Sequence, residues 1–203
     1  VSFYNETKDK GIKPTPTIGG VGLVTDYKKI ITMDLKNINN LILVVGKTEG
    51  HIEQSIFARN ILNEKKGPPP EINLFNEKNN GETILKLINE KLIKSTHDVS
   101  LGGIITAVSK MAIKGKKGFK LIKPKVLTSK FHYYFGEDQG RYIIEIEPNN
   151  LPKVQKILKE NSVHYDEIGI VTKNEVIIDK EPILHIDDLT KSNKTWLVDY
   201  MSK

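Results

Sequence analysis

The stretch that most constrains the fold is residues 97–103 (HDVSLGG), because a helix-forming pattern follows it directly. The apolar residues that recur there at helical spacing are Ile104, Ile105, Ala107, Val108, Met111, Ala112 and Ile113. The pattern predicts a helix that buries one face, with Ser100 as its N-cap and with Gly102 and Gly103 allowing a close approach. Two interpretations stay open. The free N–H groups of the first turn bind a phosphate or a carboxylate, or the segment is a tightly packed, capped helix.

Strand and helix patterns alternate along the rest of the chain. Apolar or alternating runs predict strands at 18–24, 41–45, 119–122, 142–146, 165–171 and 176–178, the last two joined through residues 172–174. Helical spacing predicts helices at 51–62, at 84–94, within 124–134, at 151–159 and over the tail 186–201. We expect the tail helix to dock through its apolar residues, which are Leu189, Trp196, Leu197 and Tyr200. This alternation predicts an α+β fold, a layered α/β sandwich.

The composition limits the chemistry that the chain can perform. Its 203 residues suffice for one sizeable core or for one domain with an attached piece. The absence of cysteine excludes disulfides, thiolate nucleophiles and cysteine-based zinc sites. The formal charge is +6, but Arg59 and Arg141 are the only arginines, and bidentate recognition of guanine or phosphate favours arginine. A basic nucleic-acid-binding module is therefore the less favoured alternative, and we expect no nucleic-acid partner.

The apolar runs are short throughout the sequence. None approaches the roughly 20 residues that a membrane-spanning helix needs. The first residues also lack the basic and then apolar form of a signal peptide. We therefore expect a cytoplasmic protein without a membrane partner.

Two groups of polar residues are candidates for chemistry. His97 beside Asp98 has the composition of a base with its orienting carboxylate, but neighbours on an extended chain point in opposite directions and do not by themselves form a dyad. Glu137, Asp138 and Gln139 would suit Mg²⁺ or a substrate amide, or they form a solvated acidic turn. The five histidines, at 51, 97, 132, 164 and 185, have no i, i+4 pair, so we expect no metal site built on them.

Five motifs taken together resemble the C-terminal end of the phosphoribosylformylglycinamidine synthase family. In order and spacing they are 1–7 (VSFYNET), 14–23 (PTPTIGGVGL), 67–70 (GPPP), 97–103 (HDVSLGG) and 135–141 (FGEDQGR). The resemblance covers essentially the whole chain. It implies that residues 38–203 form the second C-terminal-type domain of the aminoimidazole ribonucleotide synthetase-like superfamily. It also implies that residues 1–37 are the end of the preceding, ATP-binding-type domain.

The resemblance also implies an activity for the longer enzyme. That enzyme is a ligase of purine biosynthesis, which converts formylglycinamide ribonucleotide, ATP and glutamine-derived ammonia to formylglycinamidine ribonucleotide, ADP and phosphate. ATP and Mg²⁺ would be its cofactors. Its partners would be the remainder of its own chain, a separate glutaminase subunit and a small accessory subunit. The C-terminal piece would be inactive alone. A selenophosphate synthetase or a thiamine phosphate kinase of the same superfamily is the alternative.

Few functional residues are carried over by the resemblance. Ser2 matches the family's substrate-binding serine. His97, Asp98, Ser100, Gly102, Gly103, Glu137, Asp138 and Gln139 match the second-half motifs, which line an auxiliary nucleotide site or are structural. The family pattern usually has Asp where this chain has Leu101, which weakens a catalytic role for the motif. We therefore expect no catalytic residue and no metal ligand in this chain.

Overall fold

The structure is a computed structural model that describes residues 6–11, 17–125 and 129–202. The chain divides into two compact units, residues 1–30 and 31–203. In the first unit, β1 (Glu6–Thr7) pairs antiparallel with β2 (Lys10–Gly11), and a short 3-10 helix, η1, spans Tyr27–Lys29. The predicted strand at 18–24 is wrong. A strand requires a hydrogen-bonded neighbour, and none of the described residues pairs with this segment.

The second unit is built on a seven-stranded sheet with the order β4-β6-β3-β7-β5-β8-β9. The strands are β3 (Leu41–Val45), β4 (Ser95–Asp98), β5 (Gly118–Leu121), β6 (Tyr142–Ile146), β7 (Tyr165–Thr172), β8 (Glu175–Ile178) and β9 (Glu181–His185). The pairings are antiparallel except for β5 with β8, which is parallel. The predicted strands at 41–45 and 142–146 are therefore confirmed.

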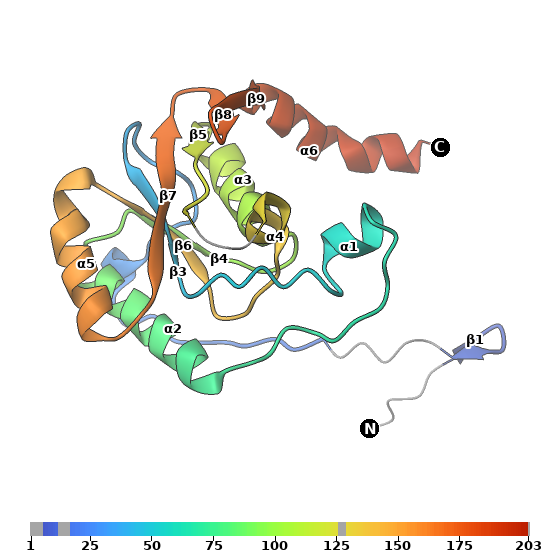
Figure 1. Ribbon diagram of the computed structural model, residues 1–203, viewed down its shortest axis with the longest axis horizontal. Coiled ribbons are helices and arrows are strands. Elements are labelled where there is room, and N and C mark those ends of the chain that lie inside the picture. Colours follow the sequence, from blue (N-terminus) through green and yellow to red (C-terminus); the bar gives the residue numbers. More distant parts are fainter. Residues whose placement is uncertain (1–5, 12–16, 126–128, 203) are drawn as a thin grey trace. The chain divides into compact units, whose positions relative to one another are not determined.

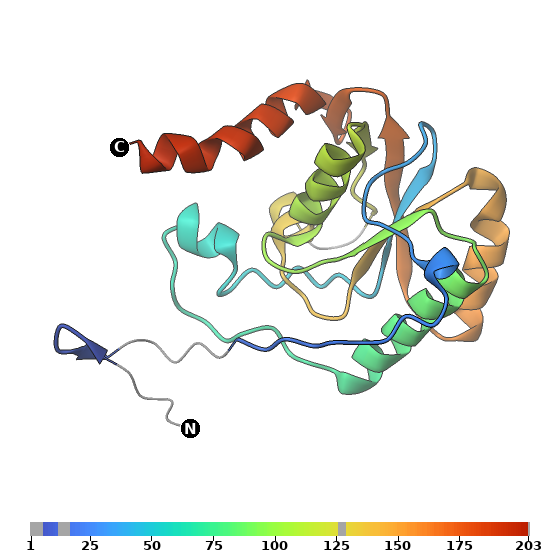
Figure 2. The same ribbon diagram turned by 180° about the vertical axis from the view of Figure 1, so that it is seen from behind.

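Both faces of this sheet are covered by helices, as Figures 1 and 2 show. Ile42 and Val44 belong to a core with α3 (Gly103–Gly115) and α4 (Lys130–Phe135). Leu43 and Val45 belong to a second core with α2 (Leu74–Asn89) and α5 (Leu151–Glu160), which follows the 3-10 helix η2 (Pro148–Asn150). Alternate residues of one strand thus enter opposite cores. The layered α/β sandwich is confirmed.

The helix boundaries differ from the predicted ones where the backbone turns sharply. Helix α1 spans only Ile56–Asn60, because Gln54 has a φ of 60° and Ser55 caps the helix through a bond from the Ala58 N–H. Helix α2 begins at Leu74, well before the predicted start at residue 84, and ends at Asn89 rather than near residue 94, where Lys91 just beyond it has a φ of 56°. Both positive φ values stop a right-handed helix.

The tail forms α6 (Ile186–Met201), with the predicted bounds. Only its first turns pack on the body, through Ile186 and Leu189. The expectation that Trp196, Leu197 and Tyr200 dock is wrong for this chain, because they remain 58%, 52% and 69% exposed. Among the described helices, none combines the length and the apolar character needed to cross a membrane.

Candidate functional site

A cleft of about 480 Å³ lies where the segment after β3, the beginning of α2 and the loop before β6 meet. Its volume falls within the range of roughly 300–1,000 Å³ that is typical of small-ligand sites. The lining is mostly polar and consists of Lys47, Glu49, His51, Pro70, Glu71, Asn73, Asn76, Glu77, Asn80, Asp138, Gln139 and Gly140. One lysine therefore faces four carboxylates. The charge disfavours an isolated anion and suits a ligand that offers hydroxyl, amide or ammonium groups.

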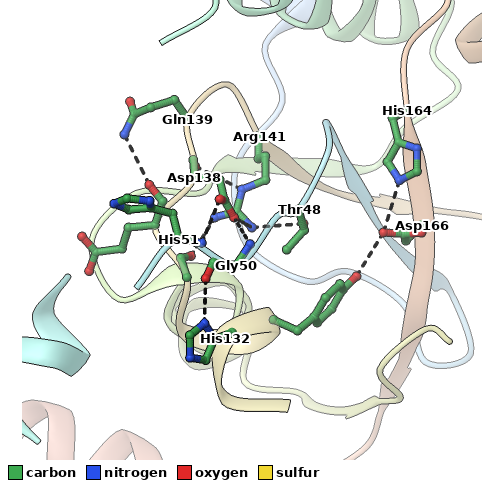
Figure 3. Close-up of polar contacts among 12 residues, drawn as sticks. Thr48, Gly50, His51, His132, Asp138, Gln139, Arg141, His164 and Asp166 are labelled. Carbon is green, nitrogen blue, oxygen red and sulfur yellow. Dashed lines mark hydrogen bonds and ion pairs between the residues drawn. The ribbon is translucent and has the colours of Figure 1, made fainter. Parts of the chain in front are cut away.

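Asp138 anchors one wall of the cleft to the segment after β3 (Figure 3). Its carboxylate accepts hydrogen bonds from the backbone N–H groups of Gly50, at 3.0 Å, and His51, at 2.9 Å. Only 8% of Asp138 is exposed. Both carboxylate oxygens are therefore engaged by the protein itself, and this explains how a charged group is held in a nearly dry position.

Arg141 fixes the other side of the same carboxylate. Its Nη1 lies 3.5 Å from Asp138 Oδ2 and donates to Thr48 Oγ1 at 3.1 Å, and Nη2 donates to the Gly136 carbonyl at 2.7 Å. The residue is 1% exposed. Burial lowers the pKa of Arg141, an effect that the charge of Asp138 opposes. This buried cation is a structural part of the loop 136–141 and does not present itself to a ligand.

Glu137 occupies the beginning of α3. Its Oε1 accepts hydrogen bonds from the N–H groups of Gly102 and Ile56, both at 2.8 Å. The positive end of α3, for which the sequence left phosphate and carboxylate open, is thus neutralised by a carboxylate of the chain itself. Ser100 is not the N-cap. Gly102 caps the helix with a φ of 83°, and the carbonyl of Ser100 accepts from the Gly103 N–H.

Gly103 permits the close packing that the paired glycines suggested. It has a φ of 70°, and a Cβ placed on it would lie 2.6 Å from the Tyr134 carbonyl oxygen and 2.7 Å from that of Gly136. Helix α3 therefore begins directly against the backbone at the end of α4. The group that approaches Gly103 closely is therefore the backbone of the protein itself.

His97 and Asp98 do contact one another. Nδ1 of His97 lies 2.9 Å from Oδ1 of Asp98, although the two residues are neighbours at the end of β4. The expectation that they point apart is wrong, because Asp98 is the last residue of the strand and its carboxylate contacts the neighbouring imidazole. Asp98 is 62% exposed at its side chain, and neither residue lines the cleft.

The proline-rich segment 67–70 is tied to the cleft wall by two side chains. Nε2 of His51 donates to the Pro68 carbonyl at 3.0 Å, which identifies the protonated nitrogen because a carbonyl only accepts. Nε2 of Gln54 donates to the carbonyls of Lys65, at 3.2 Å, and Gly67, at 3.0 Å. Since the backbone of His51 is held by Asp138, these bonds connect the segment to the same carboxylate.

The predicted site residues are thus only partly brought together. Asp138 and Gln139 line the cleft, Glu137 is bound to the Gly102 N–H outside the lining, and Ser100 is exposed on the loop before α3. Ser2 falls outside the described residues. The residues that sequence reasoning missed are Thr48, Gly50, His51 and Arg141. Only Arg141 carried a signal, as one of two arginines in a lysine-rich chain.

No cluster of three or more histidine, aspartate or glutamate side chains suited to a metal ion occurs within residues 6–11, 17–125 and 129–202. Both oxygens of Asp138 and Oε1 of Glu137 already accept hydrogen bonds from backbone N–H groups. Among the described residues, the cleft therefore offers no preformed cluster of ligands for a metal ion.

Comparison with known proteins identifies relatives along almost the entire chain. Residues 37–180 match the family described as AIR synthase related protein, C-terminal domain. The chain is 68% identical over 201 residues to phosphoribosylformylglycinamidine synthase subunit PurL of Pelagibacter ubique, which covers 99% of the chain and 28% of that protein. It is 38% identical over 205 residues to the Bartonella henselae protein of the same name, covering 100% and 28%. The chain thus spans about a quarter of the length of these relatives.

Solved structures share the fold at low sequence identity. The structure of T. maritima PurL complexed with FGAR matches with a TM-score of 0.65 and 17% identity, over 81% of this chain and 30% of that one. A thiamine-monophosphate kinase from Stenotrophomonas maltophilia matches with a TM-score of 0.52 and 13% identity, over 75% of this chain and 54% of that one.

Proposed function

We propose that this chain, which belongs to the family described as AIR synthase related protein, C-terminal domain, is the C-terminal domain of a phosphoribosylformylglycinamidine synthase. The observation that carries the proposal is the 68% identity to one such subunit over 99% of the chain. The relatives of that name match residues beyond 180, where the broader family ends, and so include α6. The specific likeness therefore exceeds what the shared fold requires.

The proposed reaction of the whole enzyme is the ATP-dependent conversion of formylglycinamide ribonucleotide to the corresponding amidine. ATP would transfer its terminal phosphoryl group to the amide oxygen, and ammonia would then attack the amide carbon and displace phosphate. Solved structures of T. maritima PurL complexed with ATP and with FGAR support this choice of ligands. Mg²⁺ would offset the charge of the transferring phosphoryl group. Its ligands are proposed to lie on other parts of the protein, since the described residues of this chain form no cluster of three or more histidine, aspartate or glutamate side chains suited to a metal ion.

Within that enzyme this chain would shape and support the active site. We assign residues 1–37 to the end of the preceding ATP-binding-type domain and 38–203 to the C-terminal domain. The family match that begins at residue 37 supports this boundary, while residues 31–37 pack with the second compact unit, where Leu35 is buried in the core. Ser2 would contact the substrate. Glu137 and Asp138 would hold the loops around the cleft, since their oxygens already serve Gly102, Ile56, Gly50 and His51. Gln139 would present its amide to the hydroxyl or amide groups of an auxiliary nucleotide, since the acidic lining disfavours the phosphates.

The proposed partners follow from the same relatives. A solved structure of PurLQS from Thermotoga maritima supports an assembly of the synthetase with two further subunits, which we propose to be a glutaminase and a small accessory protein. The location of such a biosynthetic assembly would be the cytoplasm. Among family alternatives, the thiamine-monophosphate kinase likeness is weaker in both TM-score and identity.

The test is an assay of the full-length protein encoded by the gene. Supplied with formylglycinamide ribonucleotide, ATP, Mg²⁺ and ammonium chloride, it should release ADP and form the amidine, detected by mass spectrometry. Supplied with thiamine monophosphate and ATP, it should form no diphosphate. The opposite pattern would assign the protein to the kinase branch of the family and overturn the proposal.

A further inference from the structure

Helix α6 carries one apolar stripe that is buried at its beginning and uncovered at its end. Ile186 is 3% exposed, and Leu189 packs against the core. At helical spacing from these residues, Trp196, Leu197 and Tyr200 continue the same face. They are between 52% and 69% exposed, and Figure 1 shows the helix running on past β9 to the C-terminus. An exposed apolar surface of this kind indicates an interaction site, and the described residues of the second unit leave it uncovered.

The matches to relatives named as PurL extend over the residues of α6, whereas the family match does not. The family match ends at residue 180, before α6 begins. The relatives that match 99–100% of the chain include the helix, and the chain makes up only about 28% of their length. In these relatives, a much larger part of the polypeptide is therefore available to cover the residues that match α6.

We propose that the stripe formed by Trp196, Leu197 and Tyr200 docks on the part of the full-length polypeptide that precedes residue 1. This inference rests on the proposed function, which supplies that part. The size of the stripe favours this occupant over a second copy. Three partly exposed side chains offer on the order of 350 Å², whereas a stable interface between separate proteins buries roughly 800 Å² on each partner. A covalently connected surface needs less area, because its effective concentration is high.

The test compares side-chain accessibility in the 203-residue chain and in the full-length protein by hydroxyl-radical footprinting. In the chain alone, Trp196, Tyr200 and the adjacent Met201 should be oxidised quickly. In the full-length protein their oxidation rates should fall at least fivefold. Met111 is fully buried in α3 and should react slowly in both, which provides the reference. Equal rates for the stripe in the two proteins would overturn the proposal.

A matched pair of variants separates docking from other causes of protection. In the full-length protein, Trp196→Lys should restore the oxidation of Tyr200 and Met201 to the rate seen in the chain alone. Lys191→Ala, on the opposite face of α6, should leave their protection unchanged. Protection in the chain alone that grows with its concentration, together with a dimer mass in sedimentation, would show a second copy as the occupant and refute the proposal. The assay of amidine formation is independent of this measurement, so failure of the proposed function is recognised separately.

Discussion

Arg141 is the residue on which the polar side of the cleft depends. It is almost fully buried, and its guanidinium bridges Asp138, Thr48 and Gly136. Replacement by methionine keeps an apolar chain of similar length but leaves the carboxylate of Asp138 without its cation. Removing one partner of a buried pair costs about 3–5 kcal/mol.

We therefore expect Arg141→Met to lower the free energy of urea unfolding by about 3 kcal/mol. The control is Arg59→Met, which removes the other arginine of the chain, an exposed residue in α1. The Arg59→Met variant should lower the free energy of urea unfolding by less than about 1 kcal/mol. Similar losses in the two variants would contradict the structural role assigned to Arg141.

Glu137 makes a second prediction at the residue scale. An alanine leaves the N–H groups of Gly102 and Ile56 without their acceptor, and each unsatisfied partly buried group costs about 1–3 kcal/mol. A glutamine keeps an oxygen acceptor in the same place. Thermal or urea unfolding should show Glu137→Ala less stable by about 2–3 kcal/mol, and Glu137→Gln by less than half of that. If the glutamine variant is as unstable as the alanine variant, the negative charge rather than the acceptor geometry is what matters.

The carboxylate of Asp179 makes the stability of the fold depend on pH. Burial raises its pKa, but the N–H of Lys123, the hydroxyl of Tyr134 and the ammonium of Lys130 together hold the pKa below its ordinary value of 3.8. A carboxylate with a lowered pKa stabilises the folded state above its ordinary pKa, and this contribution is lost as the pH falls toward the folded-state pKa. Asp179→Asn should therefore be less stable than the unchanged chain at pH 7.

The difference should shrink as the pH falls below 3.8, where the unchanged chain also binds the proton. Urea unfolding at pH 7, 5, 4 and 3 measures this convergence. Asparagine tolerates the φ of 50° at this position, so backbone strain is not introduced. A difference that stays constant over this range would show that the charge of Asp179 contributes nothing.

Helix α3 provides the prediction at the scale of an element. Gly103→Ala would force a Cβ to within 2.6 Å of the Tyr134 carbonyl in a backbone with a φ of 70°, so we expect a loss of about 2–4 kcal/mol. Gly81→Ala is the matched control. It lies within α2, and its Cβ would approach only the Tyr142 hydroxyl, at 3.4 Å. That variant should be more stable by about 0.5–1 kcal/mol. Changes of opposite sign in the free energy of urea unfolding would confirm the close packing at α3. An unchanged free energy for Gly103→Ala would contradict it.

The elements themselves were largely predictable from local pattern. Strand β3 is a continuous apolar run, β6 is apolar apart from Glu145, and α5 and α6 have helical spacing, so these elements could be predicted from their own residues. Their pairing was not predictable in this way. Strands β7 and β8 follow each other along the chain, yet β5 lies between them and pairs parallel with β8. Strand β9, which contains Pro182 and is mostly exposed, gave no apolar signal.

The candidate site, too, could be predicted only in part from the sequence. The motif 135–141 singled out Glu137 and Asp138, but the groups that they bind come from Gly50, His51 and Ile56, more than 80 residues earlier. Those partners are mostly backbone N–H groups, which every residue except proline possesses, so no side-chain pattern identifies them. Only the folded sheet, with β3 beside β6, brings the two segments together.

At the scale of the whole molecule, the second unit is a complete sandwich with two cores, while several large apolar side chains stay uncovered on its helices. The carboxylates that sequence motifs suggested for chemistry are engaged in holding loops. Together these features fit a domain that folds around its own core and contributes shape to a larger enzyme.

The most direct measurement is amidine formation from formylglycinamide ribonucleotide, ATP, Mg²⁺ and ammonium by three proteins: the full-length protein, the same protein without residues 1–203, and the 203-residue chain alone. We predict product from the full-length protein only. Product formation by the chain alone, or an undiminished rate in the protein that lacks it, would contradict the proposal that this chain is a required domain without its own reacting groups.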